Sequence, residues 1–371
     1  MKWTRYGDDV IPAWIADADT TVCPPVRDAI EALLDRGDLT YPDDTDVPAI
    51  VDEFVSRQQQ WFDWSPDPGL VRLVPETIQV ISVLVDRCTA AGEPVAVHTP
   101  TYPPILDELS TLGRPAVPLP WERDGDGWST DIARLEAAAD DGVRLLVLVN
   151  PHNPTGRVWT RTELEELAEV VVRRGLWVLA DEIHGELTHD GRRHIPFASV
   201  SDEVADRTVT LTAASKSFNI PGTKCVVAHI GRGSGWDPFR AVPPTQFGEI
   251  SNVGAAATLA AWRDGASWLE GFRLAIDERR RQLAAAIGEY LPEVDHAMPE
   301  ATFLSWLDCR PLELPEEPAA FFLDRGRVAL GIGPTFGPGG DGRVRVNLAT
   351  TASVLDEVIE RMVTAVDLWR G

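Results

Sequence analysis

The sequence predicts an α/β fold in which a mostly parallel central sheet carries helices on both faces, followed by a smaller α+β domain. Two observations support this prediction. The middle of the chain alternates short apolar runs with amphipathic stretches, which is typical of strands connected through helices. The C-terminal part instead contains one long helical stretch, two strand-like segments and a final helix. With 371 residues, the chain is long enough for two such domains.

The strands of the central sheet are predicted from short apolar runs. Residues 162–171 illustrate the stretches between these runs, because their apolar side chains recur at helical spacing. Strands that alternate with helices are expected to run parallel to one another. The predicted strands are residues 95–98, 143–149, 176–180, 209–211 and 225–230.

The C-terminal part predicts a separate α+β arrangement. Residues 266–290 form the long helical stretch and residues 353–369 form the final helix. The two strand-like segments between them are residues 302–307 and 343–348. No linker rich in proline, glycine or serine separates the two parts, so we expect the domains to pack closely.

The formal net charge of −24 excludes some classes of partner. A protein that binds nucleic acid needs a basic surface, and an acidic membrane surface repels an acidic protein. Residues 1–9 contain no apolar signal core, and no run of about 18 apolar residues occurs in the chain, so no membrane span is expected. The four cysteines are isolated and include no CxxC pair. These features predict a cytoplasmic protein with reduced thiols.

Lysine is rare in this chain. Only three of the 34 basic residues are lysines, namely Lys2, Lys216 and Lys224. Arginine stays protonated, whereas lysine can lose its proton and form an imine with a carbonyl group. Usage bias alone could leave three lysines, but a lysine that persists in such a sequence is a candidate for chemistry that arginine cannot perform.

Polar residues directly follow four of the predicted strands. In open α/β sheets, ligands bind outside the carboxyl ends of the strands, so these loops should converge on one rim. They supply an amide, a carboxylate, a lysine and an aromatic ring. This set suits a pyridine-aldehyde cofactor: the lysine forms the imine, the carboxylate keeps the ring nitrogen protonated, the amide binds the ring hydroxyl and the aromatic ring stacks on the face. The four loops are residues 99–104, 150–156, 181–184 and 212–219.

These residues resemble the fold-type I pyridoxal-phosphate (PLP) enzymes of the aminotransferase class I/II superfamily. Asn153-Pro154-Thr155-Gly156, Asp181, Ser215-Lys216 and Arg345 match the motifs of that superfamily in order and spacing, and the match covers nearly the whole chain. Within the superfamily, the chain is most similar to the MalY/PatB-type cystathionine β-lyases, also called cysteine-S-conjugate β-lyases. This narrower resemblance rests on residues 2–3, 14–17, 151–154, 181–184, 215–219, 306–308 and 344–347.

The resemblance implies a PLP-dependent transferase-like fold and a role for each matched residue. Lys216 would form the imine and act as acid and base at Cα, Asp181 would pair with the pyridinium nitrogen, and Asn153 would bind the ring hydroxyl. Tyr102 would stack on the ring. Arg345 would grip the substrate α-carboxylate as a bidentate fork, with Asn153 and Tyr102 also in contact with the substrate.

The phosphate of the cofactor is expected at a helix N-terminus that includes Thr77 and Ile78. Free N–H groups and the helix dipole favour an anion at such a position. Lys224 stands where many relatives place a phosphate-binding arginine. Ser215 and His184 complete the cofactor contacts that the resemblance implies.

The resemblance also implies an assembly. Tyr41 matches a tyrosine that, in relatives, reaches the phosphate from the neighbouring subunit. We therefore expect a homodimer with shared active sites. The expected division of each chain is a large PLP-binding domain at residues 41–279 and a small domain formed by residues 1–40 and 280–371.

Several residues depart from the family pattern. Residues 74–79 lack the glycine that many relatives carry, and Glu76 is an unexpected charge beside a phosphate. Ala213 occupies a position that is often a serine ligand, and Lys224 is a point charge where an arginine would be a fork. Residues 18–20 replace the usual Met-Asp-aromatic sequence, so the substrate pocket is expected to differ.

Two further patterns are formed by repeated residue types. Arg343 lies two residues from Arg345 and would face the same side of a strand, so spacing alone does not choose between them. His184, His189 and His194 recur every five residues, which does not put them on one face of a helix. No metal site is predicted from them.

The resemblance implies a carbon–sulfur β-lyase that cleaves cystathionine or a related cysteine S-conjugate to a thiol, pyruvate and ammonia. An aminotransferase on the same scaffold is the alternative. His184 bears on this choice, because aminotransferases of the superfamily commonly carry a tyrosine there. A third possibility is a regulatory or interaction protein that keeps the fold, but the intact set of Lys216, Asp181 and Arg345 argues against loss of catalysis.

Overall fold

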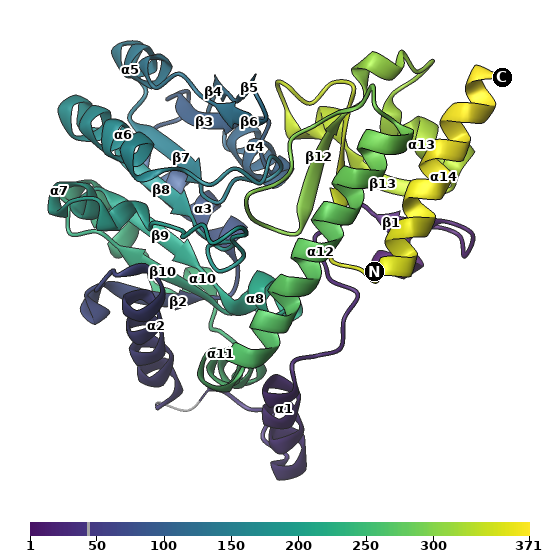
Figure 1. The fold of residues 1–371 in the computed structure, drawn as a ribbon. Helices are drawn as coiled ribbons and strands as arrows, with labels where there is room; N and C mark the ends of the chain where they lie inside the picture. The colour runs from purple at the N-terminus through teal and green to yellow at the C-terminus, as the bar shows by residue number, and fades with distance from the viewer. Residues whose placement is uncertain (43–44) are drawn as a thin grey trace.

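The computed structural model describes residues 1–42 and 45–371, and a central sheet dominates it (Figure 1). The strands are ordered β2 (Val71–Val74), β10 (Val226–Ile230), β9 (Thr208–Thr212), β8 (Trp177–Asp181), β7 (Leu145–Val149), β3 (Val95–Thr99) and β4 (Ala116–Pro120). The strands from β9 to β4 are parallel, and β10 is antiparallel to both of its neighbours. The predicted α/β architecture and its five predicted central strands are confirmed.

Helices cover both faces of this sheet. Alternate side chains of a strand point to opposite faces. Ala96 belongs to the apolar cluster that includes α5 (Ala133–Asp140) and α6 (Arg161–Arg174). Val95 and Val97 belong instead to the cluster that includes α3 (Thr77–Cys88) and α4 (Pro103–Thr111). Because both faces of the sheet are buried, the sequences of these strands are continuous apolar runs and do not alternate between apolar and polar residues.

The ends of α6 are set by its own sequence. Thr160 Oγ1 accepts a hydrogen bond from the backbone N–H of Glu163, and Glu163 accepts one from the backbone N–H of Thr160 at 2.7 Å. This capping box satisfies two N–H groups that the helix itself leaves unpaired. Gly175 ends the helix in the left-handed region, at φ 66°. The helix predicted at residues 162–171 is therefore confirmed and extends to both caps.

A second, smaller sheet lies on the other side of the molecule (Figure 1). Its order is β1 (Ile11–Ala13), β13 (Val328–Ile332), β14 (Arg343–Asn347), β12 (Leu304–Asp308) and β11 (Asp295–His296). Only the β1–β13 pair is parallel among the described strands of this sheet. The predictions for β12 and β14 are confirmed. β1, β11 and β13 went unpredicted, and for β1 and β11 the reason is that segments this short carry almost no periodicity.

The long helix α12 (Ala266–Tyr290), predicted with these bounds, joins the two parts. Its first half contributes Leu269 and Ile276 to a cluster with α11 (Asn252–Asp264). Its second half contributes Leu283 and Ile287 to the core of the second sheet. That core is completed by α13 (Pro318–Gly326) and α14 (Ala352–Arg370).

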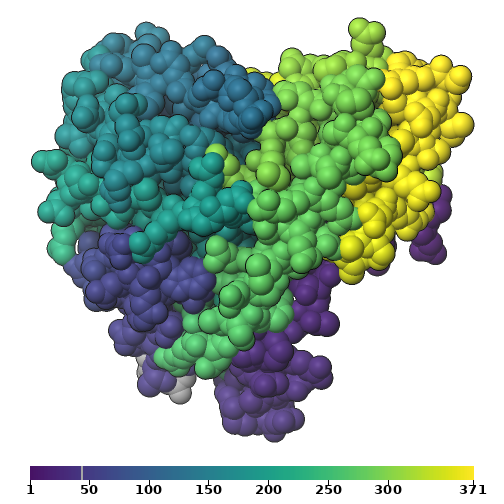
Figure 2. Space-filling model, viewed as in Figure 1, coloured from purple at the N-terminus to yellow at the C-terminus, as the bar shows by residue number. Residues whose placement is uncertain are grey.

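The N-terminal region contributes to both parts. β1 belongs to the second sheet, whereas α1 (Pro24–Arg36) and α2 (Asp46–Phe62) lie against α11. Figure 2 shows α1 projecting from the lower side of the molecule. The domain boundaries expected from the sequence stay a prediction.

The remaining elements are short. The short helices are α7 (Asp202–Asp206), α8 (Ala214–Ser217), α9 (Asp237–Arg240) and α10 (Pro244–Phe247), and β5 (Glu122–Asp124) pairs with β6 (Gly127–Ser129) in a hairpin.

Across residues 1–42 and 45–371, no helix combines the length and the apolar character that crossing a membrane would require.

Candidate active site

A cavity of about 430 Å³ opens at the carboxyl ends of the central strands. The loops after β3, β7, β8 and β9 meet there, as expected for an open α/β sheet. The second sheet supplies one wall through β14, and the N-terminal segment supplies another. The residues predicted from sequence that line it are Thr77, Ile78, Tyr102, Asn153, Asp181, His184, Ser215, Lys216, Lys224 and Arg345.

Asp181 is the last residue of β8 and is only 4% exposed. Its Oδ1 accepts a hydrogen bond from the backbone N–H of Ile183 at 3.3 Å. Burial raises the pKa of Asp181 to about 6, although the Ile183 N–H and the charge of Lys216 oppose the shift. A cationic partner in the cavity would stabilise the ionised form, so Asp181 is suited to pair with a protonated ring nitrogen.

Lys216 lies on α8, which begins two residues after β9. Its Nζ donates a hydrogen bond to the carbonyl oxygen of Ala16 at 3.1 Å. Burial lowers the pKa of Lys216, and the charge of Arg345 lowers it further, against the opposing effect of Asp17 and Asp181. Desolvation of this amine favours the neutral form, which is the nucleophile that an aldehyde requires.

Arg345 lies on β14 and is 6% exposed. Its Nη1 donates to Oδ1 of Asn153 at 3.0 Å, and its Nη2 donates to the carbonyl oxygen of Trp14 at 2.9 Å. Its Nε has no partner in the described chain. The guanidinium stands over the ring of Phe336, 5.0 Å from the centroid. Burial lowers the pKa of Arg345 to about 10, so the group still carries its charge near neutral pH.

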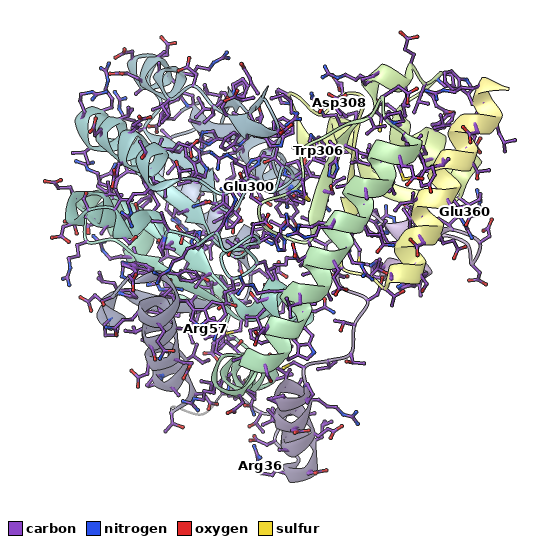
Figure 3. All side chains as sticks on the ribbon, in the orientation of Figure 1. Arg36, Arg57, Glu300, Trp306, Asp308 and Glu360 are labelled. Atoms are coloured by element: carbon purple, nitrogen blue, oxygen red, sulfur yellow. The ribbon has the colours of Figure 1, made fainter. Side chains whose placement is uncertain are left out.

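Arg343 and Arg345 lie on the same strand, but only one of them lines the cavity among the described residues. Arg343 pairs with Asp308 on β12 at 2.9 Å and is not among the described residues that line the cavity. Asp308, labelled in Figure 3, is also bound by Arg310. The structure therefore brings Arg345 to the cavity and commits Arg343 to an ion pair.

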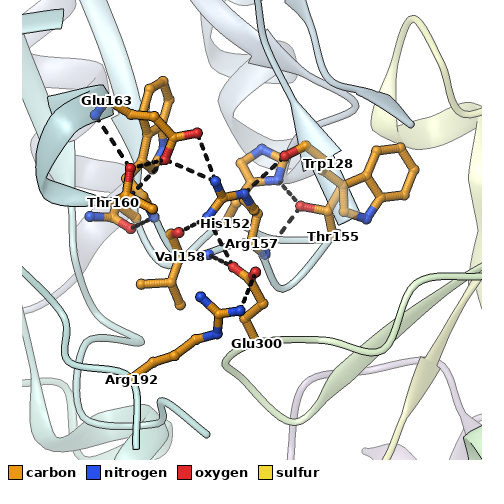
Figure 4. Close-up of polar contacts among 11 residues, drawn as sticks. Trp128, His152, Thr155, Arg157, Val158, Thr160, Glu163, Arg192 and Glu300 are labelled. Atoms are coloured by element: carbon orange, nitrogen blue, oxygen red, sulfur yellow. Dashed lines mark hydrogen bonds and ion pairs between the residues drawn. The ribbon is translucent and has the colours of Figure 1, made fainter. Parts of the chain in front are cut away.

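An ion-pair network holds the loop that carries Asn153 (Figure 4). Arg157 pairs with Glu163 at 2.7 Å and with Glu300 at 3.0 Å. Glu300 also pairs with Arg192 at 3.0 Å. Figure 3 shows Glu300 between the part with the central sheet and the part with the second sheet. The network thus fixes the Asn153 loop to both parts.

Gly156 permits the close approach of this loop to the segment that precedes β12. Its φ of 70° favours glycine, and a Cβ there would lie 2.4 Å from the Cβ of Pro299. Its carbonyl oxygen accepts hydrogen bonds from the backbone N–H groups of Glu300 and Ala301 at 3.0 and 2.9 Å. The glycine of the 153–156 motif is therefore required by packing as well as by the turn.

Tyr102 and His184 both line the cavity. Tyr102 directly precedes α4, and burial raises the pKa of its phenol. His184 is 3% exposed, and its Nδ1 has no partner in the described residues. Burial lowers the pKa of His184 to about 3, helped by the charges of Lys216 and Arg345, so the imidazole is neutral.

The end of the cavity where the phosphate is expected carries both signs of charge. Thr77 and Ile78 open α3, whose first N–H groups have no acceptor within the helix. Lys224 and Glu76 form an ion pair with each other at this end. Glu76 therefore lies beside the expected phosphate position, and its carboxylate is paired with Lys224, the lysine that was predicted to bind the phosphate.

Tyr41 lies outside the cavity of its own chain, because it is absent from the described lining and is 83% exposed. A role for Tyr41 in the cavity of a second copy stays a prediction.

Residues 15–17 line the cavity, but sequence reasoning used residues 14–17 only as family markers. Asn347 Nδ2 donates to the carbonyl oxygens of Ile15 and Asp17, both at 2.6 Å. The carbonyl oxygens of Trp14 and Ala16 accept from Arg345 and Lys216. These are backbone contacts, so no side-chain pattern in the sequence could have revealed them.

The three histidines at spacing five have different surroundings. His184 lines the cavity, whereas His189 bonds the carbonyl oxygen of Thr302 at 2.7 Å and His194 bonds Glu182 at 3.0 Å. No group of three or more His, Cys, Asp or Glu side chains among the described residues could hold a metal ion.

The arrangement suits an aromatic aldehyde that carries a phosphate. It offers a buried amine, a buried carboxylate, an amide anchored to an arginine and a helix N-terminus at the far end. The unpartnered Arg345 Nε and His184 Nδ1 are buried polar atoms for which a bound group would supply partners.

Comparisons with known proteins agree with this assignment. The model for aminotransferase class I and II matches residues 27–362. Cystathionine β-lyase PatB of Bacillus subtilis is 32% identical over 98% of this chain and 96% of its own length. Protein MalY of Escherichia coli is 30% identical over 98% of this chain and 93% of its own length. The crystal structure of cystalysin from Treponema denticola, which contains a PLP cofactor, superimposes with a TM-score of 0.92 at 26% identity and covers 98% of this chain and 93% of that one.

The fold and the site define a protein of the fold-type I α/β class, with its cavity at the rim of the parallel strands. The chain belongs to the aminotransferase class I and II family, as its sequence resemblance implied. Its similarity to PatB and MalY covers nearly all of each chain, so the narrower resemblance to MalY/PatB-type proteins is also confirmed.

Proposed function

We propose that this protein is a PLP-dependent carbon–sulfur β-lyase that acts on cystathionine or a related cysteine S-conjugate. The observation that carries the proposal is the joint placement of Lys216, Asp181 and Arg345 around one cavity in a chain similar over its full length to PatB. Its cofactor is pyridoxal 5′-phosphate, which supplies an electron-accepting ring that stores the electron pair left when the Cα proton departs.

Each residue of the chain has a task that follows from its position. Lys216 is the amine that holds the cofactor aldehyde, and once a substrate amine replaces it, its free Nζ can take the proton from Cα. Asp181, buried at the end of β8, keeps the ring nitrogen protonated. Arg345 fixes the α-carboxylate and thereby orients the Cα–H bond toward Lys216.

The products follow from the balance of atoms. Loss of the Cα proton and of the thiolate from Cβ converts R–S–CH₂–CH(NH₃⁺)–COO⁻ to R–SH and aminoacrylate. One water molecule then converts aminoacrylate to pyruvate and ammonium. No keto acid takes part in this reaction, whereas an aminotransferase needs one.

His184 supports the lyase over the aminotransferase. In aminotransferases of this superfamily, a tyrosine commonly stands here and hydrogen-bonds the ring oxygen of the cofactor. The His184 imidazole is shorter and lies in contact with Phe303, at 5.9 Å between ring centroids. The ring oxygen is then left chiefly to Asn153. The aminotransferase remains the alternative, since the family includes that activity.

The test is to incubate the purified protein with cystathionine and measure pyruvate and free thiol without any added keto acid. We expect both products in equal amounts, and none from the Lys216→Ala variant. Turnover that depends strictly on an added keto acid, with no thiol released, would replace the lyase with the aminotransferase.

A further inference from the structure

Asp17 is a charged residue of the cavity that the proposed reaction does not use. It lines the cavity together with Lys216 and Arg345 and is partly buried. Within residues 1–42 and 45–371, its carboxylate accepts no hydrogen bond and forms no ion pair. A partly desolvated carboxylate without a partner is unfavourable unless a cation from a ligand or solvent compensates for it.

The carboxylate of Asp19, two residues further along the chain, does have partners. Its carboxylate pairs with Lys2 at 2.7 Å and accepts a hydrogen bond from Trp3 Nε1 at 2.7 Å. It does not line this cavity among the described residues. Asp19 therefore anchors the N-terminal segment, whereas the Asp17 carboxylate is left for the cavity.

The backbone around Asp17 is fixed. Its carbonyl oxygen accepts hydrogen bonds from Asn347 Nδ2 at 2.6 Å and from Lys2 Nζ at 3.2 Å. The next residue, Ala18, exchanges two hydrogen bonds with the Asn219 side chain, both at 2.9 Å. A charge held on so constrained a segment can bind a ligand without a large loss of conformational entropy.

The charges of the cavity determine what Asp17 can bind. Arg345 is suited to the substrate α-carboxylate, and Asp17 repels that group. Burial lowers the pKa of Lys216, and the charge of Asp17, which lines the same cavity, opposes that shift. A substrate whose sulfur substituent ends in a cation would place opposite charges together, whereas one ending in an anion would not.

We propose that Asp17 is a specificity-determining residue that favours cysteine S-conjugates with an ammonium group on the sulfur substituent. This inference rests on the proposed β-lyase function. It assigns the distal ammonium of a substrate such as cystathionine to the wall formed by residues 15–17.

The test compares three conjugates of similar size and different charge: S-(2-aminoethyl)-L-cysteine, S-propyl-L-cysteine and S-(2-carboxyethyl)-L-cysteine. Pyruvate release gives kcat/KM for each. We expect kcat/KM for the aminoethyl conjugate to be about tenfold higher than for the propyl conjugate, which corresponds to the free energy of one charge-assisted hydrogen bond. The carboxyethyl conjugate should have the lowest kcat/KM of the three. In Asp17→Asn the aminoethyl-to-propyl ratio should fall toward one.

Asp19→Asn is the matched control, because it removes the same charge two residues away and should keep the wild-type ratio. Equal cleavage of the three conjugates by the wild type, or an equal loss for all three in Asp17→Asn, would overturn the assignment. The latter would mean that Asp17 acts on Lys216 and not on the substrate.

A second measurement separates this inference from the lyase itself. L-lysine and L-norleucine lack a sulfur leaving group, so their binding to the holoenzyme can be followed by cofactor absorbance without elimination. Preferential binding of L-lysine that is lost in Asp17→Asn supports the assignment even if no conjugate yields pyruvate. Equal binding of the two in the wild type would refute it even if all conjugates are cleaved.

Discussion

Arg345 Nη1 donates to the amide oxygen of Asn153 at 3.0 Å, which connects the second sheet to the rim of the central sheet across the cavity. Arginine has only donors, so this contact fixes the side-chain oxygen of Asn153 toward Arg345 and leaves the amide N–H groups for another acceptor. The ring oxygen of the cofactor is the acceptor that the proposed function supplies. One residue pair thus couples the site for the α-carboxylate to the site for the ring.

The first prediction tests that pair. Arg345→Gln should lower kcat/KM by at least about 100-fold, mainly through a higher KM, because a charged and buried fork to the α-carboxylate is lost. Arg343→Gln removes the same charge two residues away and should leave KM within about twofold, since Arg343 is bound to Asp308. Steady-state kinetics on both variants checks this, and a larger KM effect from Arg343→Gln would reverse the assignment.

The second prediction concerns the cofactor lysine. Borohydride reduction of the yellow holoenzyme should attach the cofactor covalently to Lys216, which peptide mapping by mass spectrometry would identify. Lys216→Ala should still bind the cofactor but lose turnover, because the Cα acid/base is gone. Lys224→Arg is the control among the three lysines and should keep the label at Lys216. A label on any other residue would rule out the proposed role of Lys216.

The third prediction concerns the ion pair at the phosphate end. Glu76 forms an ion pair with Lys224, the lysine predicted to bind the cofactor phosphate. With the phosphate in that position, the Glu76 carboxylate would compete with it for Lys224 and repel it. Glu76→Gln should therefore lower the dissociation constant of the cofactor by about tenfold, and Lys224→Ala should raise it. Fluorescence titration of the apoprotein measures both.

Glu360→Gln controls for the change in net charge, because Glu360 is exposed on α14 (Figure 3) and is not among the described residues that line the cavity. If Glu360→Gln lowers the dissociation constant of the cofactor as much as Glu76→Gln does, the effect is due to the overall charge of the protein. Weaker cofactor binding in Glu76→Gln would mean that Glu76 positions Lys224 and does not compete with the phosphate.

Much of the site could be predicted from sequence because Asp181 ends one buried strand and Lys216 lies four residues after another. Strand ends are marked by where an apolar run stops, and parallel strands bring their ends to one rim. The contacts of Ala16 and Asp17 could not be predicted, since they depend on how β1 joins the second sheet. Spacing alone could not choose between Arg343 and Arg345. The family resemblance selected Arg345, and the ion pair of Arg343 with Asp308 on the neighbouring strand agrees with that choice.

The fourth prediction concerns acid stability. His98 is 4% exposed, lies between Trp121 and Trp159, and burial lowers its pKa to about 3. Between about pH 6.5 and pH 3 the unfolded chain binds a proton that the folded protein does not. The contribution of His98 to the free energy of unfolding is thus complete above pH 6.5 and falls as the pH drops through this window. At pH 5 the loss amounts to about 2 kcal/mol.

His98→Phe removes the titrating group but keeps an aromatic ring. Its free energy of unfolding should therefore fall by about 2 kcal/mol less than that of the wild type between pH 7.5 and pH 5. Urea unfolding at both pH values measures the difference, and comparing the two proteins cancels the titration of groups that do not interact with His98. The exception is buried His152, whose pKa is lowered by burial and also by the charge of His98. An identical pH dependence for the two proteins would show that folding does not lower the pKa of His98.

The fifth prediction concerns assembly. Tyr41 is 83% exposed and lies outside the cavity of its own chain, and Leu34 and Leu39 nearby are 56% and 62% exposed. If Tyr41 completes the phosphate site of a second copy, the active unit is at least a two-fold dimer. Sedimentation at working concentration should then show a dimer, and Tyr41→Phe should weaken cofactor binding.

Mixing Tyr41→Phe chains with Lys216→Ala chains tests the shared site directly. In a mixed dimer, one site receives both substitutions and the other receives neither, because Lys216 comes from one chain and Tyr41 from its partner. Activity after verified subunit exchange should therefore exceed the mean of the two parent variants. If instead each site uses its own Tyr41, every site of the mixed dimer carries one substitution. Activity would then stay at that mean, and Tyr41 would have no role across the interface.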